Sequence, residues 1–158
     1  MQISARIAAL IVVLLACFAA GDIGSFIDVP SLIFVLPGTL FTMYAKYGKE
    51  LFNPSTDEIK DKIGREGITI SFGWGYLGAL VGFVIILGHL TDMAALGPAL
   101  AVSLLTIFYS FMLALILFYP MTKDLDPKKV FLQSTFAFLI CSGSFAITML
   151  SIMQNSPT

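Results

Sequence analysis

Three hydroxyl side chains recur within one apolar stretch of the sequence, residues 96–121. Ser103, Thr106 and Ser110 follow one another at intervals of three and four, which places them along one face of a helix, with Tyr109 beside them. Hydroxyl oxygens can coordinate water or an ion, but serine and threonine do not titrate near neutral pH. If the chain conducts protons or sodium ions, the titratable acid must therefore come from a partner helix, since intramembrane acids mark ion pathways.

A complementary stripe of small residues lies on the apolar stretch 68–90. Gly75, Gly78, Ala79 and Gly82 share one helix face and include a Gly-x-x-x-Gly pattern. In lipid, small residues let helix backbones approach closely. For either stripe alone we favour ordinary helix packing, because serine and threonine can also bond to their own helix backbone. Together the two stripes suggest a narrow polar path across the membrane.

The sequence does not support catalytic chemistry. No Asp, Glu, Lys or Arg lies in the middle of an apolar stretch, and the single histidine, His89, is placed at the end of one. No Ser/His/Asp set, carboxylate pair, metal cluster or phosphate loop can be assembled. The sequence therefore predicts no enzyme, no metal and no cofactor, and a net charge of −1 gives no indication of nucleic-acid binding.

The elements that must position these residues are transmembrane helices. Apolar residues make up 58% of the chain and the mean hydropathy is +0.92, which predicts an all-α, polytopic membrane protein. About five stretches are long enough to cross roughly 30 Å of hydrocarbon. They are residues 3–20, 29–45, 68–90, 96–121 and 130–153.

Positive charge predicts the orientation of these helices. Eight of the nine Lys and Arg residues lie in the loops 46–65 and 123–129, whereas the loops around 22–28 and 89–92 carry none. Because positively charged loops stay in the cytoplasm, we expect the N-terminus inside and the C-terminus outside a bacterial inner membrane. A signal peptide, or lipoprotein processing at Cys17, is the alternative for the first stretch, but the immediate return into a second one favours a retained helix.

Local signals predict several helix ends. Asp28, followed by Pro30, predicts the start of a helix, and Pro37 with Gly38 predicts a kink in its middle. In the loop 46–67, Ser55 and Glu58 form a capping-box pattern. This pattern predicts one short connector helix that lies on the membrane surface.

Three stretches resemble a known family. The sequence GDIGSFIDVPSLIFVLPGTL, residues 21–40, resembles the first outer loop and second helix of the MotA/PomA flagellar stator subunits. GYLGALVG, residues 75–82, resembles their third helix, and LGPALAVSLLTIFY, residues 96–109, with FYPMTKDL, residues 118–125, resembles their fourth helix and its exit. The resemblance implies a four-helix membrane core over 1–125, and residues 126–158 would add one C-terminal transmembrane helix.

The resemblance also implies an assembly. Members of the MotA/TolQ/ExbB kind would form a homopentamer around two copies of a MotB-like partner, whose single membrane helix carries an ion-binding Asp. On that mapping Ala79, Ser103, Thr106 and Tyr109 would face the partner. Pro120 would match the family proline near the inner end of the fourth helix.

The sequence departs from the family pattern in ways that bear on function. The large cytoplasmic insert is reduced to about 46–67, Phe72 takes the place of a family proline, and the preferred threonine of the fourth helix aligns with Ile107, next to Thr106. Ala79 is typical of proton-type members, whereas the FIDVP loop is similar to sodium-type members. Protons are therefore the favoured ion and sodium is the alternative.

The leading interpretation is an ion-conducting motor subunit that couples proton-motive force to mechanical work on the cell envelope. A non-conducting membrane scaffold of the same fold is the second interpretation, because two family positions are substituted. A small transporter ranks last, since no broken helix with polar ligands is evident beyond Pro37 and Gly38.

Overall fold

The computed structural model describes residues 23–89 and 93–123, together with eight isolated helical positions in the flanking segments: Ile11, Leu15, Phe18, Leu132, Leu139, Gly143, Ala146 and Leu150. The predicted helices 3–20 and 130–153 otherwise lie outside the described residues. The count of five transmembrane helices and the orientation of the chain therefore stay predictions.

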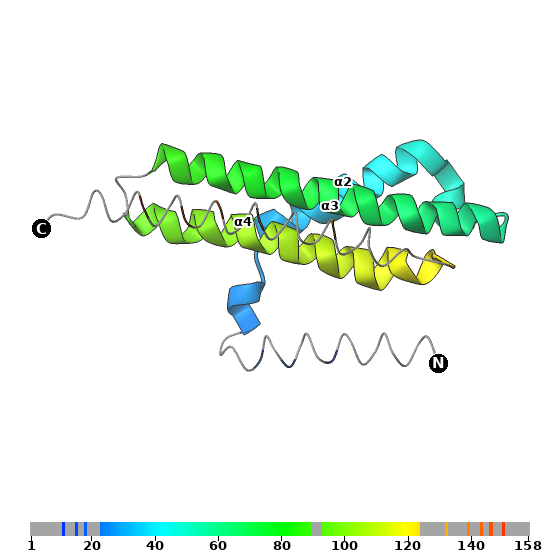
Figure 1. The fold of residues 1–158 in the computed structure, drawn as a ribbon, viewed down its shortest axis with the longest axis horizontal. Coiled ribbons are helices and arrows are strands. Elements are labelled where there is room, and N and C mark those ends of the chain that lie inside the picture. Colours follow the sequence, from blue (N-terminus) through cyan, green and yellow to red (C-terminus); the bar gives the residue numbers. More distant parts are fainter. Residues whose placement is uncertain are drawn as a thin grey trace, which may run out of the picture.

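Three long helices form the described part of the chain, which contains no strand: α2 (Val29–Tyr47), α3 (Asp57–Gly88) and α4 (Met93–Leu113). Figure 1 shows α3 and α4 side by side as an antiparallel hairpin, and α2 contacts both helices. Three helical stretches, Val29–Leu51, Asp57–Gly88 and Leu96–Met121, are long and apolar enough to cross a membrane. The chain is an all-α protein with the helices of a multi-pass membrane protein.

The start of α2 confirms the predicted helix signal. Asp28 is the N-cap, its Oδ2 accepts a hydrogen bond from the backbone N–H of Ser31 at 2.9 Å, and Pro30 occupies the first turn. The carboxylate satisfies an N–H that has no partner inside the helix, and proline costs nothing in a turn whose N–H groups are free anyway. Pro37 lies inside α2, which continues to Tyr47.

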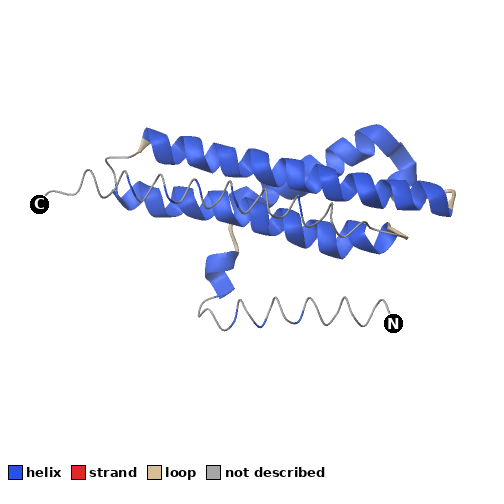
Figure 2. Ribbon diagram, viewed as in Figure 1, coloured by secondary structure: helices blue, strands red, loops and turns tan. Residues whose placement is uncertain are grey.

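The start of α3 differs from the prediction. The expected short surface helix is instead the first part of α3, which runs from Asp57 to Gly88 without a break (Figure 2). The N-cap is Thr56, whose Oγ1 accepts from the backbone N–H of Ile59 at 3.3 Å, so the predicted Ser55 cap is wrong. No proline occurs within α3, and therefore nothing interrupts its hydrogen-bond ladder between the charged and apolar parts.

The end of α4 changes its helical geometry. The five residues Ala114–Phe118 form a π-helical turn, η3, and Tyr119–Met121 form a 3-10 turn, η4. Pro120 has no N–H to donate, and its ring would clash with the carbonyl of Ile116 in a regular α-helix. A wider turn before the proline relieves this clash. The helical stretch ends at Met121, as predicted from the sequence.

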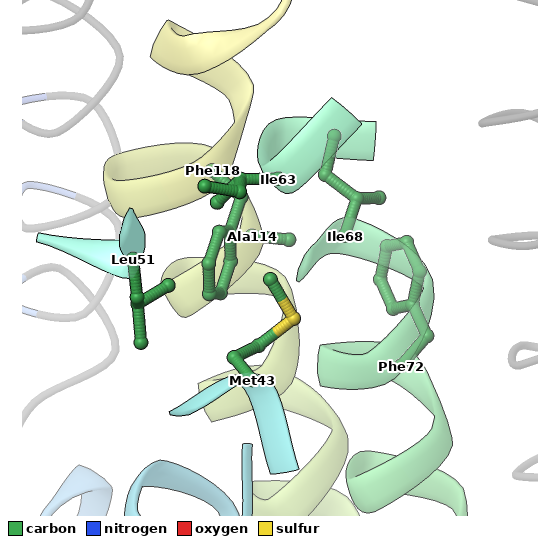
Figure 3. Packing of buried hydrophobic residues seen from close by; sticks show 7 residues of the cluster. All are labelled: Met43, Leu51, Ile63, Ile68, Phe72, Ala114 and Phe118. Atoms are coloured by element: carbon green, nitrogen blue, oxygen red, sulfur yellow. The ribbon is translucent and has the colours of Figure 1, made fainter. Parts of the chain in front are cut away.

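An apolar cluster joins all three helices near the end of the hairpin that carries the charged residues. Its seven buried residues come from α2, from the 3-10 turn η2 (Gly48–Leu51), from α3 and from η3: Met43, Leu51, Ile63, Ile68, Phe72, Ala114 and Phe118. Figure 3 shows these side chains gathered around Phe118, which is fully buried. Phe72 lies edge-on to Phe111 at 4.7 Å between ring centroids, so this position fills the core where the family has a proline.

Candidate functional site

The predicted hydroxyl and glycine stripes face each other across the contact between α3 and α4, which we call the α3–α4 seam. A Cβ atom added at Gly75 would overlap the side chain of Ser110, and one added at Gly78 would overlap that of Thr106. A Cβ at Gly82 would overlap Ser103 in the same way. The hydroxyl side chains therefore occupy the space that the glycines leave open, as in other closely packed membrane helices.

The three hydroxyls are buried, with 4%, 1% and 1% of Ser103, Thr106 and Ser110 exposed. All of them donate to backbone carbonyls: Ser103 to Ala79 and Ala99 at 3.2 and 3.3 Å, Thr106 to Val102 and Ser103 at 3.0 and 3.1 Å, and Ser110 to Ile107 at 2.7 Å. Only the bond from Ser103 to Ala79 crosses between helices. These bonds satisfy each hydroxyl donor within the chain itself.

Ala79 lies in the same seam as the hydroxyls. It is 5% exposed and forms a small apolar cluster with Ile107. The structure therefore brings four predicted partner-facing residues together in one intrachain contact: Ala79, Ser103, Thr106 and Ser110. Their role in an ion path stays a prediction.

Tyr109 points away from the seam and toward the segment before α2. Its hydroxyl donates to the carbonyl of Phe26 at 2.6 Å and accepts from the backbone N–H of Asp28 at 2.8 Å. Sequence reasoning grouped Tyr109 with the hydroxyl face because the residues are adjacent. One helical step of about 100° instead turns it toward α2.

Two further glycines extend the seam toward the charged end and were missed from the sequence. A Cβ at Gly67 would overlap the ring of Phe118, and one at Gly64 would overlap Thr122. Buried Ser71, which donates to the carbonyl of Gly67 at 2.8 Å, lies between them and Gly75 on α3. The sequence signal that could have revealed them is the stripe of small residues that runs from Gly64 to Gly82 on one helix.

Pro120, which the sequence indicated as a packing residue, lies in η4, directly after the π-helical turn that carries Phe118.

Trp74 joins α2 to α3. Its ring lies where a Cβ of Gly38 would be, its Nε1–H donates to Thr42 Oγ1 at 3.0 Å, and Phe34 meets it edge-on at 5.4 Å. The structure shows that Gly38 forms the space in α2 that receives the indole ring.

Ion pairs surround the charged end of the bundle. Arg65 pairs with Asp61 on α3 at 2.8 Å, as the spacing of four predicts, and Asp61 also accepts from the backbone N–H of Lys123 at 2.7 Å. Two more pairs, Lys46 with Glu66 at 2.5 Å and Lys123 with Asp57 at 3.1 Å, connect α2 and the end of the hairpin to α3. Within 23–89 and 93–123, no group of three acidic, His or Cys side chains could hold a metal ion.

Part of the chain is similar in sequence to motility proteins. Motility protein A of Cereibacter sphaeroides is 39% identical over 59 residues, which are 37% of this chain and 23% of that protein. Chemotaxis protein PomA of Vibrio alginolyticus is 40% identical over 55 residues, 35% of this chain and 22% of its own length. The uncharacterized protein YtxD of Bacillus subtilis is 44% identical over 55 residues, 35% and 20% of the two chains.

These matches are partial. The chain spans about a fifth of the length of the curated relatives it matches, and no family model matches it. Over the matched segment they confirm the resemblance to MotA/PomA proteins that the sequence stretches indicated. The named relatives are proteins of motility and chemotaxis, and none carries the name of an enzyme.

Proposed function

We propose that the chain is an ion-conducting motor subunit of the bacterial inner membrane, with protons as the favoured ion and sodium as the alternative. The observation that carries this proposal is identity of about 40% to motility proteins over more than 50 residues, in a chain whose described part has three helices suited to a membrane. Several ions per cycle could drive mechanical work, because one charge crossing the membrane yields about 2.3 kcal/mol per 100 mV.

The chain would act with a MotB-like partner. In this proposal copies of the chain form a homopentamer around two partner subunits, and each partner helix carries the titratable Asp. The described residues support a partner of this kind because the buried polar side chains of α2, α3 and α4 are all serines and threonines. Hydroxyls can coordinate water or an ion along a path but do not titrate near neutral pH.

Thr106 is the seam residue that we propose for the ion path. Its Oγ1 already bonds to the carbonyls of Val102 and Ser103, so it offers lone pairs but no spare donor. Such a group can coordinate a cation or a hydronium ion if the seam borders the partner helix. Ala79 and Ser103, one turn away, would line the same path.

Reconstitution tests the proposal. The chain is co-expressed with a one-helix protein that contains a membrane Asp, the complex is purified, and ion uptake into vesicles is followed with a pH-sensitive dye. We expect uptake from the complex and none after Asp→Asn in the partner. A stable complex without uptake would instead indicate a non-conducting scaffold, and uptake by the chain alone would indicate a transporter.

A further inference from the structure

The connection that precedes α2 contacts the helical stretch Leu96–Met121, formed by most of α4 and the turns η3 and η4, far from either end of that stretch. Tyr109 lies 13 residues after its start and 12 residues before its end. At 1.5 Å per residue, this is about 20 Å from Leu96. Because Asp28 and Phe26 both bond to the Tyr109 hydroxyl, they lie near the middle of this stretch and not beside its end. Figure 1 shows the chain joining the hairpin at this level.

The pairing of α3 with α4 places Asp28 at the same depth. Thr106 and Ser110, which flank Tyr109, face Gly78 and Gly75. These glycines lie near the centre of the uncharged part of α3, which begins after Glu66 and ends at Gly88. Asp28 therefore lies level with the centre of the apolar length of both helices.

Several backbone groups of this connection find hydrogen-bond partners within the protein itself. Tyr109 bonds to the carbonyl of Phe26 and the N–H of Asp28, and the N–H of Ile27 donates to Gly24 at 3.0 Å. The carbonyl of Asp28 accepts from Leu32 at 3.0 Å. Non-helical backbone at membrane depth persists only where protein or enclosed water satisfies it, so these bonds suit a segment surrounded by lipid and protein.

We propose that the segment Ile23–Asp28 is recessed into the membrane, and that Tyr109 is the positioning residue that holds it at the mid-height of the helical stretch Leu96–Met121. The ring of Phe26 lies 6.1 Å from that of Phe108, which adds an apolar contact at the same place. The recess places the carboxylate of Asp28, which caps α2, below the membrane surface, so the chain would itself hold one acid at membrane depth where the sequence indicated an outer loop. This inference depends on the helix register and not on the proposed function.

Fluorescence quenching by brominated lipids measures the depth directly. Trp74 is the single tryptophan of the chain, so a Trp74→Phe background can carry one reporter at a time: Ile27→Trp, Leu77→Trp or Leu87→Trp. All three positions are exposed on the described chain. In vesicles that contain the full chain, we expect Ile27→Trp to match Leu77→Trp, with strongest quenching by bromines deep in the acyl chains. A profile that matches Leu87→Trp would overturn the recess.

A second measurement covers the case in which the tryptophan background does not fold. Ile27→Cys and Leu87→Cys are compared in a chain whose Cys17 and Cys141 are replaced by serine, with Trp74 kept. We expect a membrane-impermeant maleimide to label Leu87→Cys and to leave Ile27→Cys unlabelled. Equal labelling of both positions would contradict a recessed segment.

Tyr109→Phe separates positioning from general packing. The variant keeps the ring and removes the hydroxyl that holds Phe26 and Asp28. We expect the residue 27 reporter to move toward shallow quenchers, or to become labelled, while the Leu77 reporter stays deep. Tyr119→Phe, at an exposed tyrosine near the charged end, is the matched control and should change neither reporter. An unchanged residue 27 depth in Tyr109→Phe would show that the tyrosine does not position the segment.

Discussion

α4 makes two contacts of different kinds. Toward α3 it presents small hydroxyl side chains that fill the spaces above glycines, so the two backbones lie close together. Toward the start of α2 it presents Tyr109, a long side chain whose single hydroxyl bridges two backbone groups. The first contact depends on glycines, which have no side chain. The second depends on a single hydroxyl group, that of Tyr109. The α3–α4 hairpin should therefore tolerate almost no added volume, whereas the contact between α4 and the segment before α2 should respond mainly to the loss of hydrogen bonds.

Added volume in the seam should have the largest effect. Gly78→Val places branched methyl groups against Thr106, and overpacking of this kind costs about 1–3 kcal/mol. Gly73→Val is the matched control on the same helix, since nothing lies within 4 Å of a Cβ there. Thermal unfolding in detergent should show a clear loss for the first variant only. Equal losses would mean that helix propensity, and not the seam, sets the stability.

The contact between α2 and α3 should be weaker. Trp74→Phe removes the hydrogen bond to Thr42 and part of the ring that lies over Gly38, and we expect a loss of about 1 kcal/mol. Thr42→Val removes the acceptor of that bond and the bond that the hydroxyl donates to the carbonyl of Gly38 on its own helix, but it leaves the indole ring in place and should cost less. A loss of stability from Trp74→Phe as large as that from Gly78→Val would contradict the expectation that the α2–α3 contact is weaker than the α3–α4 seam.

Loss of one seam hydroxyl should affect function more than stability. Thr106→Val keeps the volume of the side chain and removes its oxygen, whose hydrogen bonds both go to carbonyls of its own helix and therefore do not join α3 to α4. We expect little change in unfolding but reduced ion uptake by the complex, with Thr106→Ser retaining uptake. If Thr106→Val conducts normally, the seam is packing alone and the path lies on another face.

The exposed ion pairs should matter least. Lys123→Gln removes a pair with Asp57 in which both side chains are more than half exposed, and such pairs contribute about 0–1 kcal/mol. The small loss should disappear at high salt, because mobile ions screen exposed charges. A loss of stability that persists at high salt would show that this ion pair is shielded from solvent, in contrast to its exposure in the structure.

What could be predicted from the sequence was local. The Asp28 cap and the Arg65–Asp61 pair each join residues three or four positions apart, so spacing alone reveals them. The two stripes were also visible, because each lies within one helix. That the stripes would face each other was not, since Gly75 and Ser110 meet only through the turn that joins α3 to α4.

The features that the sequence did not predict, or predicted wrongly, have physical reasons. Tyr109 and Asp28 are 81 residues apart, and no periodic pattern connects them. The charged loop suggested a separate surface helix, but a change of polarity does not end a helix when no proline or unsatisfied cap interrupts it. The contact between Trp74 and Gly38 has no signal in the sequence, because the two residues belong to different helices.

The uninterrupted course of α3 has a mechanical consequence. A helix of 32 residues is about 48 Å long, which exceeds the hydrocarbon thickness of about 30 Å by several turns. Its charged turns extend beyond the apolar length of the helix and continue without a break to the glycines that pack against α4. A push or torque on the charged end would therefore be transmitted directly to the α3–α4 seam, with no separate transmission element.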